Sequence, residues 1–198
     1  MLGRILGTGI IGDDMKVIIV TGMPGAGKEE FVKVSKEMGF DVVRMGDVVR
    51  MEAAEKKIAS DDQNIGNFAH SERLKYGYDI WAKRTVPLVK SKKTVIDGCR
   101  GESELSIFKD AFGEDLIVIA IHASARTRYD RLKRRNRSDA PANFEQFQER
   151  DQRELRWGLG NLIALADRVV VNEGTLEEFR ENVRALLKEI DGNEVQDR

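Results

Sequence analysis

Short apolar runs recur along the chain, at residues 17–21, 41–45, 94–96, 116–121 and 168–171. They are rich in valine and isoleucine, and polar and apolar positions hardly alternate within them. Long stretches with helical spacing separate one run from the next. This pattern is typical of parallel strands that are buried on both faces, so the sequence predicts an α/β fold.

Two connections between the predicted strands are longer than a single crossover helix requires. About fifty residues separate the second run from the third, and about forty-five separate the fourth from the fifth. Both connections are therefore expected to carry additional structure. After the last run, Thr175 and Glu178 have capping-box spacing, and an apolar stripe predicts a packed helix made of Leu176, Phe179, Val183, Leu186, Leu187 and Ile190.

The composition fits one globular domain without a global electrostatic partner. The chain has 198 residues, and its 41% hydrophobic content is enough for one core. Its 33 basic and 34 acidic side chains nearly cancel, so no overall field favours nucleic acid or a membrane. The apolar runs are too short to cross a bilayer, and a single cysteine, Cys99, cannot form an intramolecular disulfide. We therefore expect a cytoplasmic protein with no membrane partner.

The two ends of the chain are expected to lie outside the main domain. Residues 1–14 contain a G-x-G-x-x-G pattern from Gly7 to Gly12, but no adequate strand precedes it and no helix follows it. A dinucleotide site needs both elements, so we interpret the pattern as a decoy in a poorly structured extension. Residues 191–198 are expected to form a polar tail. A single domain at residues 15–190 remains.

A complete phosphate-binding loop follows the first predicted strand. Its sequence is G-x-x-x-x-G-K, and a helical pattern begins directly after it. Glycines let backbone N–H groups turn toward phosphate oxygens, the start of the helix adds partial positive charge, and the lysine reaches the β- and γ-phosphates. An ordinary turn would not need three glycines at these offsets. The sequence therefore predicts an ATP site made of Gly22, Met23, Pro24, Gly25, Ala26, Gly27 and Lys28.

Magnesium is expected to arrive with ATP, but one position departs from the usual loop. The residue after Lys28 is normally a serine or threonine that binds the ion, and here it is Glu29. Glu29 could bind the metal directly or through water, could simply begin the helix with a favourable charge, or could signal weakened catalysis. Asp97 ends the third predicted strand, where a Walker-B carboxylate would hold magnesium or its water shell; the alternative is a turn aspartate.

Two segments resemble the acceptor-binding segments of adenylate kinases and related nucleoside monophosphate kinases. Residues 45–50, Met-Gly-Asp-Val-Val-Arg, resemble their T-G-D-x-x-R segment. Residues 96–100, Ile-Asp-Gly-Cys-Arg, resemble their D-G-x-x-R segment, although the spacing is one residue shorter and the usual proline is missing. The resemblance implies that Arg50 and Arg100 bind the phosphate of the acceptor and that Asp47 orients Arg50.

A basic stretch resembles the short lid of these kinases. Residues 126–137 hold seven basic residues in twelve, and further arginines follow up to residue 156. Arginines on a closing segment can stabilise the charge that spreads over a transferring phosphoryl group, and Arg134 and Arg150 are the candidates for this role. The alternatives are a solvated helix face and a patch that contacts an RNA backbone.

The last strand and its loop resemble the same kinases and dephospho-CoA kinase, in which backbone atoms there face the adenine. Asn172 is therefore assigned to the nucleotide site, with a plain turn residue as the alternative. The resemblance covers residue 15 to about residue 190. It implies a three-layer P-loop fold with strand order 2-3-1-4-5, an acceptor-binding insertion at about residues 46–86 and a lid at about residues 126–156. The chain is similar to an archaeal group known only as adenylate-kinase-related, whose substrate is unsettled.

Other reactive residues are expected to be structural. Cys99 has no recognisable histidine partner and is interpreted as a packed small residue, and His70 and His122 are too few for a zinc site. The aromatic residues of the first long connection either stack on an acceptor base or pack the connection itself: Tyr76, Tyr78 and Trp81.

The sequence as a whole predicts an enzyme that moves the γ-phosphoryl group of ATP to a small nucleotide-like acceptor, a nucleoside monophosphate in the first place. If the acceptor were the hydroxyl of dephospho-CoA, Asp47 would be its proton acceptor. A different class of function stays open as well, in which an adenylate-kinase-like ATPase acts as a switch on a protein or RNA partner.

Overall fold

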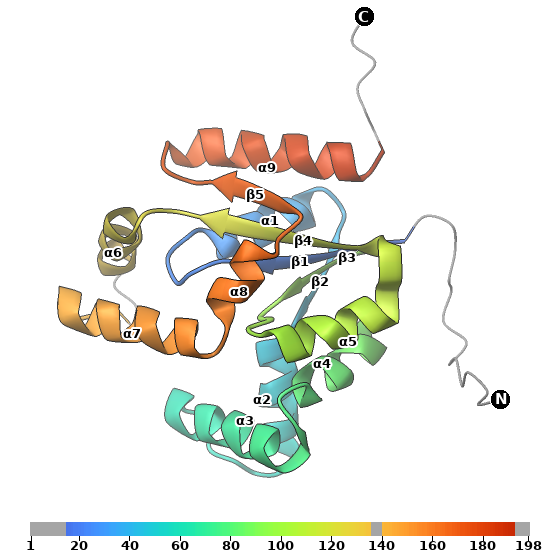
Figure 1. The fold of residues 1–198 in the computed structure, drawn as a ribbon, viewed down its shortest axis with the longest axis vertical. Helices are drawn as coiled ribbons and strands as arrows, with labels where there is room; N and C mark the ends of the chain where they lie inside the picture. The colour runs from blue at the N-terminus through green and yellow to red at the C-terminus, as the bar shows by residue number, and fades with distance from the viewer. Residues whose placement is uncertain (1–14, 136–139, 193–198) are drawn as a thin grey trace, which may run out of the picture.

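The computed structural model describes residues 15–135 and 140–192. At its centre is one parallel sheet of five strands in the order β2-β3-β1-β4-β5 (Figure 1). The predicted fold class and strand order are therefore confirmed. The strands are β1 (Lys16–Thr21), β2 (Asp41–Arg44), β3 (Lys93–Asp97), β4 (Leu116–His122) and β5 (Arg168–Val171). The predicted extension at residues 1–14, part of the predicted lid at residues 136–139 and most of the tail lie outside the described residues.

The strands form where the apolar runs are, and the boundaries that differ do so by one residue. Residue 45 was expected to end the second strand, but β2 ends at Arg44 and Met45 begins helix α2 (Met45–Glu55). The reason is the helical spacing of the buried side chains: Met45, Val48 and Val49 lie on one face and pack into the same core. The strand prediction counted the first member of a helical stripe as the last member of a strand.

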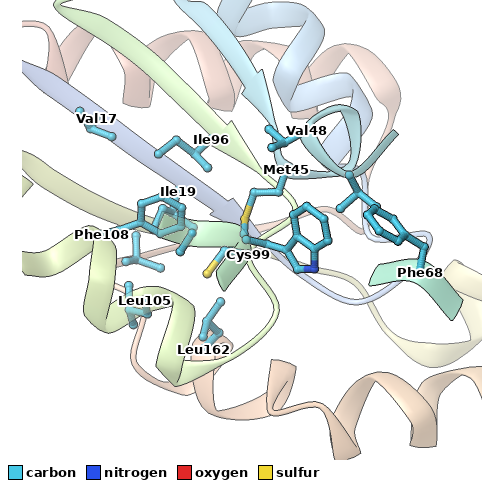
Figure 2. Close-up of a cluster of buried hydrophobic side chains, with 14 of the residues drawn as sticks. Val17, Ile19, Met45, Val48, Phe68, Ile96, Cys99, Leu105, Phe108 and Leu162 are labelled. Carbon is cyan, nitrogen blue, oxygen red and sulfur yellow. The ribbon is translucent and has the colours of Figure 1, made fainter. Parts of the chain in front are cut away.

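Two layers of helices cover the sheet. Helices α1 (Lys28–Glu37) and α9 (Leu176–Ile190) pack on one face with the side chains of Ile18 and Val20. On the other face, side chains of β1 and β3 pack against a second set of helices (Figures 1 and 2). This set comprises α2, α3 (Asp62–Tyr76), α4 (Ile80–Thr85), α5 (Glu102–Phe112) and α8 (Leu159–Ala164).

The last helix begins as predicted. The capping box of Thr175 and Glu178 is present, and Phe179, Val183 and Leu187 of the predicted stripe are fully buried. Leu176 was wrongly placed in that stripe, because its side chain is 54% exposed. It belongs to the first turn of α9, which directly follows the edge strand β5, so it has less of the sheet to pack on.

The long connection from β2 to β3 consists of α2, α3, α4 and the short 3₁₀ turn η1 (Val86–Leu88). Trp81 is completely buried, meets Phe68 edge to face at 5.8 Å between ring centroids, and donates a hydrogen bond from Nε1 to the Ala69 carbonyl oxygen. Trp81 therefore packs the connection, whereas Tyr76 and Tyr78 are exposed. Of the two alternatives for these aromatic residues, packing holds for the tryptophan.

The long connection from β4 to β5 carries α6 (Ala125–Arg134), α7 (Phe144–Arg156) and α8. Figure 1 shows α6 and α7 at the end of the sheet toward which β4 points. The 3₁₀ turn η2 (Gly113–Asp115) joins α5 to β4 on the opposite side. Across the described ranges, no helix is both long and apolar enough to cross a membrane.

Candidate functional site

The loop from Gly22 to Lys28, called the phosphate loop below, joins β1 to α1 in a conformation that only glycine adopts easily. Gly22, Gly25 and Gly27 have φ angles of 147°, 83° and 121°. Any side chain at Gly22 would collide with the Ile121 carbonyl oxygen, and one at Gly25 would lie 2.9 Å from the Arg128 carbonyl oxygen. The glycines therefore serve both the turn and its close packing against β4 and α6.

Lys28 is folded back into this loop. Its Nζ donates a hydrogen bond of 2.6 Å to the Gly22 carbonyl oxygen. Burial lowers the pKa of Lys28 to about 8, while the negative charges of Asp97 and Glu154 oppose that shift. A lysine whose charge is poorly solvated gains from an incoming phosphate, so the loop is prepared for an anion.

A group of charged side chains lies beside Lys28 at the ends of β2 and β3. Asp97 is the last residue of β3, and its direct neighbour across the sheet is Arg44, the last residue of β2. Arg44 Nη2 donates to Glu29 Oε1 at 2.7 Å, so a guanidinium lies on one of the two predicted metal ligands. Burial raises the pKa of Asp97, although the charges of Lys28 and Arg44 oppose the rise.

Asn172 reaches the phosphate loop from the end of β5. Its buried side-chain Nδ2 donates to the Ala26 carbonyl oxygen at 2.8 Å. Arg131 of α6 donates to the backbone oxygen of Asn172 at 3.0 Å and to its Oδ1 at 3.1 Å. The amide group is therefore used to hold the loop in place.

Arg128 holds three segments together, and nothing in the sequence distinguished it from the other basic residues of its stretch. Its Nη1 donates to the Pro24 carbonyl oxygen at 3.2 Å, and its Nε donates to the Ala123 carbonyl oxygen at 3.1 Å. Both Nη atoms bind the carboxylate of Asp151, at 2.8 and 2.5 Å. The side chain is buried and lies over the ring of Phe147. Arg128 thus connects the phosphate loop, α6 and α7.

Arg100 lies between α5 and α7. Its Nη1 is 3.4 and 3.5 Å from the two carboxylate oxygens of Glu154, which is a buried residue of α7. Its guanidinium also lies 5.2 Å from the ring centroid of Trp157. The backbone N–H of Arg100 donates to Glu104, and Glu104 pairs with Arg73 of α3. The backbone of Arg100 is thus held after the end of β3, and its side chain is directed toward α7.

Of the other predicted site residues, one lies near Lys28 and the rest are exposed at the surface. Arg150 of α7 is near enough to Lys28 for its charge to lower the pKa of that lysine. Arg50 and Asp47 form a 3.5 Å pair in which both side chains are mostly exposed. Arg134 is exposed and donates to the backbone of its own helix. The structure therefore gathers Arg100 and Arg150 around Lys28, whereas Arg50 and Arg134 lie on the surface.

Cys99 belongs to the apolar core, as Figure 2 shows. Its thiol is buried, and burial raises the pKa of that thiol far above its usual range. A thiol held in its neutral form among apolar side chains is a poor nucleophile. Within residues 15–135 and 140–192, no group of three histidine, cysteine or acidic side chains has the arrangement of a metal centre.

Several residues of this site were missed from the sequence, among them Arg44, Arg128 and Glu154. A signal existed for Arg44, because it is the last polar residue of a predicted parallel strand, as Asp97 is. No sequence signal distinguished Arg128 within its basic stretch or Glu154 within an amphipathic helix. Their importance depends on partners that only the fold brings close.

Comparison with known proteins agrees with this architecture. Residues 21–148 match the family model described as an AAA domain. The chain is also 51% identical over 172 residues to a UPF0200 protein of Thermoplasma volcanium, and the match covers 86% of this chain and 96% of that protein. The chain is an AAA-domain protein of the UPF0200 family. UPF0200 names a group of relatives and states no activity.

Two solved structures that resemble this UPF0200 chain at low sequence identity are kinases. Shikimate kinase from Acinetobacter baumannii, in complex with shikimate, aligns with a TM-score of 0.58 and 14% identity, covering 92% of this chain and 96% of that one. A gluconokinase from Sinorhizobium meliloti aligns with a TM-score of 0.54 and 16% identity, covering 91% and 95%. Together with the sheet order, these matches establish the P-loop kinase fold.

Proposed function

We propose that this protein is an ATP-dependent phosphotransferase that moves the γ-phosphoryl group of ATP to a small nucleotide-like acceptor, a nucleoside monophosphate in the first place. The observation that carries the proposal is the phosphate loop with Lys28 at the point where the strand order reverses. Both β1 and its neighbour β3 end there, so the loop lies beside Asp97 and Arg100. Ligands of open α/β sheets bind at such points.

The donor site is formed by the phosphate loop. The backbone N–H groups of the loop, which residues 22–28 other than Pro24 provide, and the start of α1 suit the β- and γ-phosphates of ATP, and Lys28 exchanges its carbonyl partner for a phosphate oxygen. Asn172 contributes by holding the Ala26 carbonyl oxygen, which keeps the loop open toward the nucleotide.

The residues present fit magnesium as the ion that accompanies ATP. Asp97 and Glu29 offer carboxylate oxygens, the ligands that Mg²⁺ prefers. Glu29 follows Lys28 in the sequence, and Asp97 is close enough to Lys28 for the charge of the lysine to lower its pKa. They would hold the ion or its water shell, and the ion would neutralise charge on the β- and γ-phosphates. Arg44, which binds Glu29 in the structure, supplies a second positive charge at the same place.

The acceptor site is proposed to lie between the β2–β3 connection and α7. Arg100, and Arg50 oriented by Asp47, bind the acceptor phosphate, and Arg150 and Arg134 stabilise the charge on the transferring group. An acceptor phosphate oxygen attacks the γ-phosphorus, the bond to the β,γ-bridging oxygen breaks, and ADP leaves. Because a phosphate oxygen is already a nucleophile, positioning supplies most of the catalysis.

One observation favours a second candidate, an ATPase switch that acts with a protein or RNA partner. Glu29 replaces the metal-binding hydroxyl and is paired with Arg44. A weakened metal site would slow transfer and leave ATP binding intact. A hydroxyl acceptor, as in a dephospho-CoA-type kinase, would instead make Asp47 the proton acceptor.

Product analysis tests the proposal. The protein is incubated with magnesium, ATP and a panel of AMP, CMP, UMP, GMP, deoxynucleotides and dephospho-CoA. We expect one acceptor to become phosphorylated and Lys28→Ala to lower that rate by about 10²-fold or more, since it removes a charged donor aimed at the transferring group. Lys33→Ala on the exposed face of α1 is the matched control and should keep the activity. ADP and free phosphate without a phosphorylated acceptor would favour the switch.

A further inference from the structure

Glu154 is a buried acidic side chain for which the proposed reaction provides no role. It lies in the last turns of α7, and its side chain is 9% exposed. Burying a carboxylate is costly unless a cation accompanies it, so its position at the mouth of the phosphate loop needs a reason.

The surroundings of Glu154 are cationic. Arg100 contacts both of its oxygens, and the negative charge of Glu154 raises the pKa of Lys28, whereas Arg100 and Arg150 lower it. One carboxylate therefore lies among the cations that a phosphorylated ligand would use. Without Glu154, the positive charges of Lys28, Arg100 and Arg150 would repel one another with no anion between them.

The contact between Glu154 and Arg100 is loose compared with a neighbouring contact of the same helix. Asp151, one turn earlier, binds Arg128 at 2.8 and 2.5 Å, which is the length of strong charge-assisted hydrogen bonds. The Arg100 contacts measure 3.4 and 3.5 Å. Asp151 therefore anchors α7 to α6, whereas Glu154 makes a contact that can be exchanged.

We infer that Glu154 is a displaceable internal anion: it contacts Arg100 until the anionic group of the acceptor binds there and displaces it. The inference rests on the proposed function in taking Arg100 as the group that binds that anion. Glu154 is thus a positioning residue. It keeps Arg100 and the last turn of α7 in place until a phosphate arrives, and it competes with that phosphate for Arg100.

Trp157 offers a direct signal for this exchange. Its ring lies 5.2 Å from the guanidinium carbon of Arg100 and 5.6 Å from that of Arg153, and its side chain is half exposed. The only other tryptophan, Trp81, is completely buried in the core. A change in fluorescence on ligand binding at Arg100 therefore comes from Trp157.

The test is a fluorescence titration of the full-length protein with inorganic phosphate. We expect Glu154→Gln to bind phosphate about tenfold more tightly than the wild type, because the competing charge is gone and the shape is kept. Glu149→Gln, on the exposed side of the same helix, is the matched control and should match the wild type. The gain from Glu154→Gln should vanish in an Arg100→Gln background. An unchanged or weaker affinity, or an equal gain without Arg100, would overturn the inference.

A second measurement uses the wild-type protein alone, in case Glu154→Gln folds poorly. Displacement of Glu154 should loosen the end of α7, so phosphate should accelerate amide hydrogen exchange at residues 152–157 and leave the turn around Asp151 protected. Slower or unchanged exchange at residues 152–157 would contradict displacement. Phosphate can bind without being transferred. The expected binding and exchange results, found together with no phosphorylated acceptor, would therefore contradict the proposed function and leave the displacement of Glu154 intact. A phosphorylated product without an effect of Glu154→Gln would sink the displacement alone.

Discussion

The phosphate loop and the charged side chains around it differ in how they are made. The loop is seven consecutive residues whose glycines set the backbone and whose lysine folds back on the Gly22 carbonyl oxygen. The charged groups come from β2, β3, α6 and α7, and their partners are distant: Arg128 and Asp151 are 23 residues apart, and Arg100 and Glu154 are 54 apart. Local backbone chemistry is visible in a sequence, whereas pairing between charged side chains depends on the whole fold.

The largest effect is expected where the distant contacts hold the loop. Arg128→Met should lower the free energy of unfolding by about 3–5 kcal/mol, because it leaves the largely buried carboxylate of Asp151 without its cation. Urea unfolding measures the loss. The double variant Arg128→Met/Asp151→Leu should regain much of it, since two apolar groups can replace a buried pair. A loss below about 1 kcal/mol in the single variant would show that the pair is no more than a surface contact.

The next effect concerns the loop backbone. Gly22→Ala should lower the free energy of unfolding by roughly 3 kcal/mol, because it combines a positive φ with a collision against the Ile121 carbonyl oxygen. Gly39→Ala is the matched control: its φ of 84° is also positive, but nothing lies within 4 Å of the added methyl group. It should cost only about 1 kcal/mol. Equal losses in the two variants would mean that close packing adds nothing to the loop.

The smallest effect is a pH dependence of ATP binding. Burial lowers the pKa of Lys28 to about 8, whereas a bound phosphate favours the charged form and raises that pKa. Above about pH 8, binding must therefore take up a proton, and the affinity should fall by up to about tenfold per pH unit. Dissociation constants for ATP between pH 7 and 9.5 measure this.

The same shift affects stability in the opposite direction. The unfolded state keeps a lysine pKa of 10.5, so between about pH 8 and 10.5 it binds more protons than the folded state does. Lys28 therefore makes the folded protein more stable as the pH rises through that window. Lys28→Arg, whose charge does not titrate there, should flatten both profiles. An affinity for ATP that is constant from pH 7 to 9 would contradict the lowered pKa.

The sequence predicted the fold and the phosphate loop because both depend on local patterns. Runs rich in valine and isoleucine predicted every strand that the described residues form, and the glycine spacing with Lys28 predicted the loop. The strand order came from the resemblance to nucleoside monophosphate kinases, since no pattern in one chain specifies it. Met45 was misplaced because it lies where β2 ends and α2 begins. An apolar residue at this position fits the apolar run of the strand as well as the helical spacing of α2.

The rest of the candidate site could not be predicted, for a physical reason. Seven basic residues share the stretch at residues 126–137, and only the position of Asp151 selects Arg128 among them. Glu154 and the solvent-facing Glu149 are both glutamates of α7, and the sequence does not tell them apart. Only the fold places Glu154 against Arg100. The assignment of Asn172 to the nucleotide site stays a prediction, and its amide donates to the Ala26 carbonyl oxygen and accepts from Arg131, two contacts that the sequence did not predict.

The most direct test of phosphotransfer follows the γ-phosphate itself. ATP labelled at the γ-phosphate is incubated with the protein, magnesium and AMP, or with the acceptor found in the panel, and the products are separated. We predict that the label appears in the phosphorylated acceptor and that Lys28→Ala abolishes this transfer while Lys33→Ala preserves it. Label found only as inorganic phosphate, at a rate that no acceptor changes, would contradict the kinase and leave an ATPase.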